Sequence, residues 1–202
     1  MDENKNKQLV VCIGREHGSM GHEIARKLAD KRGISLYDKE ILQDLSKEYN
    51  IDEEYMEKYD EKPKNPIISR VTNSISGSLE DVIAEKVFRY QRQLMRSGES
   101  FVVVGRCSDY ILKDYNNAVK IFIYGDEAKR IENIKNKNGC SERTAKREML
   151  NVDKARKFYH DHYSNTRWGD PVAYDLMIDS TATGIDGAVE IVSRYLDYLL
   201  GE

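Results

Sequence analysis

Short apolar runs alternate with amphipathic stretches along most of the chain. The runs rich in β-branched or aromatic residues predict five strands, at Leu9–Ile13, Ile34–Tyr37, Phe101–Val104, Val119–Tyr124 and Leu176–Asp179. Between them, apolar residues recur at helical spacing and predict helices ending near Gly33 and over about 39–49, 78–97, 126–137, 141–162 and 185–199. This alternation predicts an α/β fold of three layers, α/β/α, around a central five-stranded parallel sheet.

A glycine-bearing turn separates the first predicted strand from the first predicted helix. A strand, a glycine loop and a helix N-terminus together form an anion cradle, because backbone N–H groups and the helix dipole point at the same place. The P-loop pattern GxxxxGK(S/T) is absent. The turn therefore predicts phosphate binding and leaves phosphate transfer open. Its candidate ATP- or phosphate-binding residues are Gly14, Arg15, Glu16, His17, Gly18, Ser19, Met20, Gly21 and His22.

Ligands of open parallel sheets bind at the carboxyl ends of the strands. Besides the glycine turn, Asp38, Gly105-Arg106 and the stretch from Tyr124 to Arg130 lie at such ends. We expect these residues to converge. Asp38 has a simpler interpretation as the cap of the helix that follows it.

The length and composition indicate one domain over residues 1–202. Within it, the acidic and tyrosine-rich stretch 50–77 carries Pro63 and Pro66 and predicts a mobile acceptor-side excursion, or else a plain surface loop. A net charge of −3 gives no general attraction to nucleic acid. No apolar run is long enough for a membrane span, and three widely spaced cysteines favour a reducing, cytoplasmic location. The oligomeric state stays open.

Six motifs occur in an order that resembles a known family. They are the glycine turn, LYDKE from Leu36, VVVGRCSDYIL from Val102, VKIFIYGDEAKRIENI from Val119, VDKARKFY from Val152 and YDLMIDST from Tyr174. In this order they resemble the cytidylate kinase-like branch of the nucleoside monophosphate kinases, which are P-loop phosphotransferases. The resemblance implies a P-loop kinase fold with a helical lid, here about 141–168. It also implies ATP and Mg²⁺ as cofactors and nucleotides as small-molecule partners.

The resemblance also implies roles for particular residues. Arg106 and Arg130 match the arginines that bind the acceptor nucleotide. Asp38, which follows a predicted strand, is a further candidate for the acceptor side. Asp153 and Arg156 match the D-x-x-R of the lid helix, where the arginine closes over the phosphates. Taken alone, a D-x-x-R is more simply explained as a surface i,i+3 ion pair, and its position in the order of motifs brings the lid role level with that explanation.

One departure from the family pattern concerns catalysis. Gly21 falls where the phosphate-binding lysine belongs, and His22 falls where the Mg²⁺-binding Ser or Thr belongs. Another cation must therefore neutralise the developing charge, and Arg15 and Arg156 are the candidates, with Asp153, for the catalytic set. Mg²⁺ is then expected to be held mainly through nucleotide phosphates.

Other residues give weaker signals. His17 and His22 are more simply polar loop residues than metal ligands. His160 and His162 face different sides of a helix and so do not predict a zinc site, and Cys107 is most simply a small buried side chain.

Three functions are compatible with these patterns. The first is ATP-dependent phosphoryl transfer to a nucleoside monophosphate, CMP-like. The second is the same chemistry on a non-nucleotide small molecule, and the third is nucleotide or anion binding without catalysis, which the missing lysine suggests.

Overall fold

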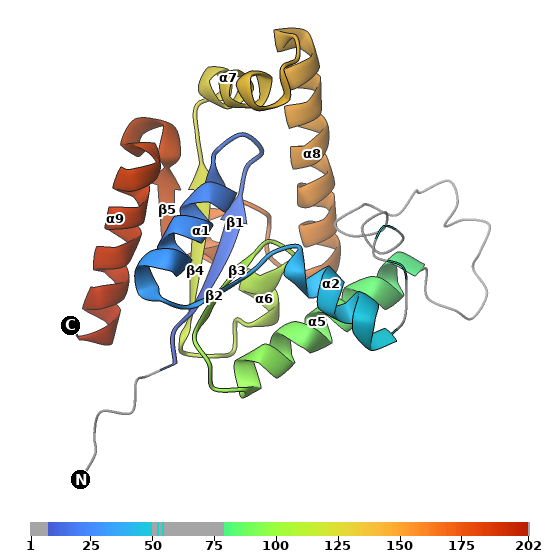
Figure 1. Ribbon diagram of the computed structural model, residues 1–202, viewed down its shortest axis with the longest axis vertical. Coiled ribbons are helices and arrows are strands. Elements are labelled where there is room, and N and C mark those ends of the chain that lie inside the picture. The colour runs from blue at the N-terminus through green and yellow to red at the C-terminus, as the bar shows by residue number, and fades with distance from the viewer. Residues whose placement is uncertain (1–7, 50–51, 53, 55–78, 202) are drawn as a thin grey trace.

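The computed structural model describes residues 8–49, 52, 54 and 79–201, and we discuss the structure of these residues only (Figure 1). All strand pairings in the five-stranded sheet are parallel, and the strand order is β2-β3-β1-β4-β5. The strands are β1 (Val10–Arg15), β2 (Ser35–Tyr37), β3 (Phe101–Val104), β4 (Ala118–Tyr124) and β5 (Leu176–Asp179). The predicted sheet is confirmed.

Helices cover both faces of the sheet. Alternate residues of β1 point to opposite faces, so Val11 and Ile13 pack on one side and Val10 and Cys12 on the other. The first side is covered by α1 (Gly21–Arg32) and α9 (Ser180–Leu200), and the second by α2 (Glu40–Tyr49), α5 (Leu79–Arg96) and α6 (Ser108–Ile111). Because both faces are covered, the strands are mostly apolar, and β3 is buried along its whole length.

Two further helices stand at the carboxyl edge of the sheet. They are α7 (Glu127–Asn138) and α8 (Glu142–Tyr163), and Figure 1 shows α7 packed across the upper end of the long α8. A small separate core joins them, made of Ile131, Ile134, Ala145 and Met149. At its other end, α8 packs through Tyr159 into the core on the side of the sheet that α2, α5 and α6 cover. The helix therefore links α7 to the sheet.

Some predicted boundaries differ from the structure. The element α9 begins at Ser180, where the Asp179 side chain caps it, but Gly184, with a non-helical φ of 69°, interrupts it. The helix predicted over 185–199 is the part that follows this kink. The short helix α6 was not predicted. The predicted excursion at 50–77 lies almost entirely outside the described residues. None of the described helices has the length and hydropathy that a membrane span requires.

Candidate active site

The glycine turn after β1 is held by hydrogen bonds within the protein. The N–H of Glu16 donates to the carbonyl of Ile123, and the hydroxyl of Ser19 donates to the carbonyl of Glu16. Ser180 donates in turn to the carbonyl of Ser19 at 2.6 Å. Ser19 is fully buried, so its hydroxyl holds the shape of the turn and does not face the cleft.

Gly18 is the tightest point of this turn. Its φ is +81°, and a Cβ at this position would lie 2.5 Å from the backbone carbonyl oxygen of Arg130. The side chain of Asn133 donates a 2.9 Å hydrogen bond to the carbonyl of Gly18. The turn is therefore packed directly against α7, and only glycine fits there.

We expect Gly18→Ala to lower the free energy of unfolding by at least about 2 kcal/mol, because it adds a backbone clash to the cost of a positive φ. Gly33→Ala is the matched control, since Gly33 also has positive φ but has no atom within 4 Å of its added Cβ. We expect about 1 kcal/mol for the control. Urea unfolding measures both, and equal losses for the two variants would contradict the proposed clash.

A buried cluster of charges joins the turn to α7 and α8. The guanidinium of Arg130 lies 2.8 Å from Glu16 and 3.0 Å from Asp153, and Arg130 is only 6% exposed. The second oxygen of Asp153 accepts the N–H of His17 at 2.7 Å. Burial raises the pKa of Glu16, and the charge of Arg130 offsets part of this effect.

Asp153 is bound much as this kind of turn binds a phosphate. A backbone N–H of the turn and both terminal nitrogens of an arginine donate to its carboxylate. The sequence also allowed a surface i,i+3 ion pair between Asp153 and Arg156. The Asp153 carboxylate binds His17 and Arg130 instead. Arg156 instead donates to the carbonyl of Arg15 at 3.2 Å.

A second charged group lies where β2 ends. One oxygen of Asp38 lies 2.8 Å from Nδ1 of His22, and the other accepts a 3.1 Å hydrogen bond from Arg106. Burial by itself would raise the pKa of Asp38, but the hydrogen bond from His22 and the charges of Arg15 and Arg106 outweigh it and lower that pKa. Instead of the simple cap suggested by its position, Asp38 thus links the start of α1 to the end of β3.

We expect this contact to make stability depend on pH. The hydrogen bond to Asp38 raises the pKa of His22 above 6.5. The contact between His22 and Asp38 therefore stabilises the fold fully below pH 6.5, and this stabilisation is lost as the pH rises through the raised pKa of His22. The side chain of His22 is 46% exposed, so we expect less than about 1 kcal/mol.

Urea unfolding of the wild type and His22→Gln measures this effect. The difference in free energy of unfolding between them should be larger near pH 5.5 than near pH 8.5. Parallel pH profiles for the two proteins would rule out the linkage.

Two cavities meet at the carboxyl edge of the sheet. The larger is a cleft of about 440 Å³ between the glycine turn, α7 and α8, and the smaller, of about 20 Å³, lies between the ends of β1 and β3 and α8. Arg106 lines the smaller cavity. Arg15 and Arg156 line both, so these two arginines lie where the cavities adjoin.

The structure brings most of the predicted site residues together. The large cleft is lined by Arg15, Glu16, His17, Gly18, Met20, Gly21, His22, Asp38 and Arg156. Gly14 lines the small cavity only, whereas Ser19, Arg130 and Asp153 line neither of the two. Arg130 does not join Arg106 and Asp38, because it lies on α7 and is engaged with Glu16 and Asp153.

Several residues of the cleft were missed from the sequence. The cleft is also lined by Lys39, Asn133, Lys137, Asn138 and Glu148. A carboxylate oxygen of Glu148 lies 2.9 Å from Nε2 of His17. Burial is the main cause of the lowered pKa of His17, which the contact with Glu148 opposes. Most of these residues lie on polar helix faces, where they look like ordinary solvated positions, so hydrophobic periodicity gives no signal for them.

The turn that carries Arg106 has an unusual backbone. Gly105, Arg106 and Cys107 have φ of 71°, 50° and 58° in succession. Two non-glycine residues in this region cost about 1–2 kcal/mol each. The turn is held partly by Gln91, which donates to the carbonyl of Arg106, and it directs a 3% exposed arginine toward Asp38. Such strain is typical of functional sites.

The chain is similar over most of its length to known proteins. A cytidylate kinase from Methanocaldococcus jannaschii is 24% identical over 196 residues, which cover 95% of this chain and 99% of that protein. The crystal structure of an uncharacterized protein from Eubacterium ventriosum superposes with a TM-score of 0.75 at 32% identity, over 94% of this chain and 99% of that one. Shikimate kinase from Bacteroides thetaiotaomicron has a TM-score of 0.54 at 7% identity, over 94% and 98% of the two chains, and shares the fold alone.

The match to the family itself extends over most of the chain. The sequence model of the cytidylate kinase-like family matches residues 10–182, which include the glycine turn, the Gly-Arg turn and the D-x-x-R of α8. The resemblance seen in the six motifs is confirmed, and the chain belongs to the cytidylate kinase-like family.

Proposed function

We propose that this protein transfers the γ-phosphoryl group of ATP to a nucleoside monophosphate, CMP-like in its chemistry. One observation carries the proposal. Arg15 and Arg156 lie where the cleft beside the glycine turn adjoins the cavity beside Arg106. A phosphoryl group that passes from a donor in the cleft to an acceptor near Arg106 would cross this point. Membership of the family supports the same reaction.

Arg15 and Arg156 take the place of the missing lysine in this proposal. Phosphoryl transfer depends mostly on positioning and on neutralising the charge of the transferred group, and forked guanidiniums do both. The Arg156 side chain donates to the backbone carbonyl of Arg15, so the Arg156 guanidinium lies against the glycine turn at Arg15. We assign residues 14–22 to the donor phosphates and residues 141–168 to a lid of the single domain.

Arg106 and Asp38 are the proposed acceptor-side pair. Asp38 holds Arg106 through a 3.1 Å hydrogen bond, which fixes the direction of the guanidinium. Arg130, which the family resemblance places on the acceptor side, lines neither cavity. Here we assign it to holding Glu16 and Asp153 in place.

The residues of the cleft fit Mg²⁺ as a partner of the nucleotide more than of the protein. The carboxylates nearest the turn already bind Arg130, His22 and Arg106. His22 stands where a hydroxyl ligand would be expected. When bound with the nucleotide, Mg²⁺ would neutralise phosphate charge, and it would require few ligands from the protein.

A second candidate function is nucleotide or anion binding without catalysis. The specific observation in its favour is that the backbone N–H of His17 already donates a hydrogen bond to Asp153, in a turn that lacks the lysine. Phosphate binding at that N–H would then require Asp153 to move.

An assay of ADP release separates these functions. The protein is incubated with Mg-ATP and, in turn, with CMP, the other nucleoside monophosphates, and a set of non-nucleotide phosphoryl acceptors. Release that depends on CMP or a close analogue supports the proposal. Release only with a non-nucleotide acceptor refutes the nucleotide part of it and leaves a kinase on the same fold.

Thermal unfolding completes the test. ATP-dependent stabilisation with no ADP release on any acceptor supports the non-catalytic function. If millimolar ATP and millimolar monophosphates leave the melting temperature unchanged, the glycine turn is not a phosphate site and both functions fail.

A further inference from the structure

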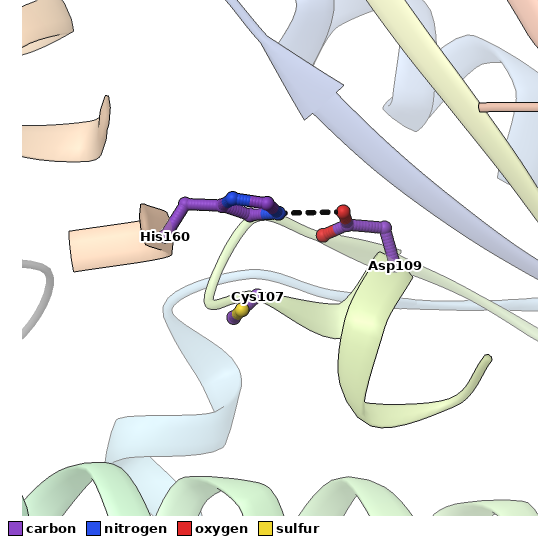
Figure 2. A group of neighbouring side chains, drawn as sticks. All are labelled: Cys107, Asp109 and His160. Carbon is purple, nitrogen blue, oxygen red and sulfur yellow. Dashed lines mark hydrogen bonds and ion pairs between the residues drawn. The ribbon is translucent and has the colours of Figure 1, made fainter. Parts of the chain in front are cut away.

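Three potential metal ligands meet below the Gly-Arg turn. Cys107 ends the turn, Asp109 lies in the first turn of α6, and His160 reaches them from α8 (Figure 2). One ligand atom from each lies within 4.8 Å of the others, and all three side chains are buried. Figure 2 shows the His160 ring directed at the Asp109 carboxylate, with 2.7 Å between Nε2 and the oxygen.

A fourth polar group lies beside this cluster. Tyr174 is 8% exposed and lines the same 20 Å³ cavity as Cys107, Asp109 and His160. Its hydroxyl is buried near Asp109 and Gly169, but within the part of the chain that is described it makes no hydrogen bond of good geometry. A buried hydroxyl that is not fully satisfied is costly, so it points to an occupant of the cavity. The volume suits a single water or a single ion.

The hydrogen bonds around His160 leave the correct nitrogen for a metal. Nε2 of the ring lies 2.7 Å from an Asp109 oxygen, and Nδ1 lies 3.2 Å from the hydroxyl of Ser164, which also lies 2.8 Å from the carbonyl oxygen of Thr166. The nitrogen that faces the other two ligands is therefore Nε2, and Nδ1 has a hydrogen-bond partner of its own. A histidine ligand is commonly oriented in this way, with one ring nitrogen donating to a neighbour and the other facing the metal.

We propose that Cys107, Asp109 and His160 form a binding site for one Zn²⁺-like divalent cation, with the Tyr174 hydroxyl beside the open position. A thiolate, an imidazole and a carboxylate are the donors that zinc prefers. Tetrahedral zinc holds such ligands about 3.5 Å apart, so shifts of about 1 Å suffice.

The charges of the site balance when the metal is bound. Uptake displaces the proton of the Cys107 thiol and, where it is present, the proton between His160 and Asp109, and both pass to solvent. The thiolate and the carboxylate then neutralise the two charges of the cation. Arg106 and Arg156 line the same cavity and favour these anionic ligands. The site does not depend on the proposed kinase reaction.

The test uses the full chain, stripped with a chelator, kept reduced and free of nucleotide. Equilibrium dialysis against micromolar Zn²⁺ followed by elemental analysis should give about one equivalent per chain. Co²⁺ in place of Zn²⁺ should give the near-ultraviolet charge-transfer band of a cobalt-bound thiolate. Cys107→Ser should abolish the band and weaken metal binding at least about tenfold.

Cys140→Ser is the matched control, because Cys140 is a free cysteine far from the cluster in sequence and only partly buried. This variant should keep both the band and the affinity. His160→Gln is a second test, since glutamine can still hydrogen bond to Asp109, and it should weaken binding as Cys107→Ser does. Circular dichroism confirms that each variant is folded.

Three results would overturn the proposal. The first is wild-type protein that retains well under one equivalent of either metal. The second is a cobalt band that Cys107→Ser leaves intact or that Cys140→Ser removes. The third is full metal affinity in folded His160→Gln. A Cys107→Ser variant that fails to fold leaves the wild-type uptake and His160→Gln to decide.

Discussion

Arg106→Met is expected to lower kcat/KM for the nucleoside monophosphate by about 100- to 1000-fold, while the Kd for ATP stays within about threefold. Arg106 is almost fully buried beside Asp38 and lines the cavity away from the larger cleft. A guanidinium in such a site interacts strongly with phosphate, because little water competes with it. Methionine keeps most of the side-chain volume and removes the charge.

Two further variants make this result specific. Arg106→Lys keeps the charge but loses the fork, so we expect an intermediate loss. Arg96→Met, at the exposed end of α5, should leave the kinetics unchanged. Steady-state kinetics gives kcat/KM, and thermal melting identifies any loss caused by unfolding. A folded Arg106→Met protein with wild-type kcat/KM would remove Arg106 from the acceptor site.

Arg130→Met should lower the free energy of unfolding by about 3–5 kcal/mol. Arg130 is the cation between Glu16 and Asp153, and its removal leaves two partly buried carboxylates near one another without compensation. The cluster also holds the glycine turn, since Asp153 accepts the N–H of His17 and Glu16 accepts the N–H of Gly125. Urea unfolding measures the loss.

Lys129→Met is the control for Arg130→Met. Lys129 precedes Arg130 in the chain and pairs with Glu132 on the surface. We expect the free energy of unfolding of this variant to change by no more than about 0.5 kcal/mol. Adding Glu16→Gln to Arg130→Met should recover part of the stability, because it removes one of the repelling charges. A loss below about 1 kcal/mol for Arg130→Met would show that the cluster contributes little.

The predicted elements match the structure best where one face or both faces of an element are buried. The strand at Phe101–Val104 is buried along its length and has the predicted bounds, and Gly33, near which the first helix is predicted to end, caps α1 with a φ of 63°. The prediction was poorest at α6, a single helical turn at the Gly-Arg turn. Four residues are too few for hydrophobic periodicity, and the positive φ of Arg106 and Cys107 depends on tertiary contacts instead of on residue type.

Partners within the site were harder to predict than its location. The carboxyl ends of the strands converge as expected, because parallel strands bring their ends to one edge. Asp38 resembles a helix cap in sequence, yet its oxygens are taken by His22 and Arg106, which lie on other elements. Arg130 resembles an acceptor ligand, yet α7 directs it to Glu16 and Asp153. Pairings of this kind depend on how helices pack, which local residue patterns do not record.

His160 shows the same division between local and tertiary information. With His162 as its only local companion it predicts no metal site, since the two side chains leave the helix on different faces. Packing of α8 against the Gly-Arg turn brings His160 to Asp109, 51 positions earlier in the chain, at 2.7 Å.

The order of apolar runs and motifs determined the parallel sheet, the family and the edge at which the candidate site lies, because these follow from periodicity and from local turn chemistry. The tertiary structure alone decided which charges compensate one another. It placed Asp153 on the turn, set Arg15 and Arg156 between two cavities, and gathered Cys107, Asp109 and His160. The physical reason is that buried charges and polar groups are stabilised by specific partners at hydrogen-bonding distance, and those partners lie far away along the chain.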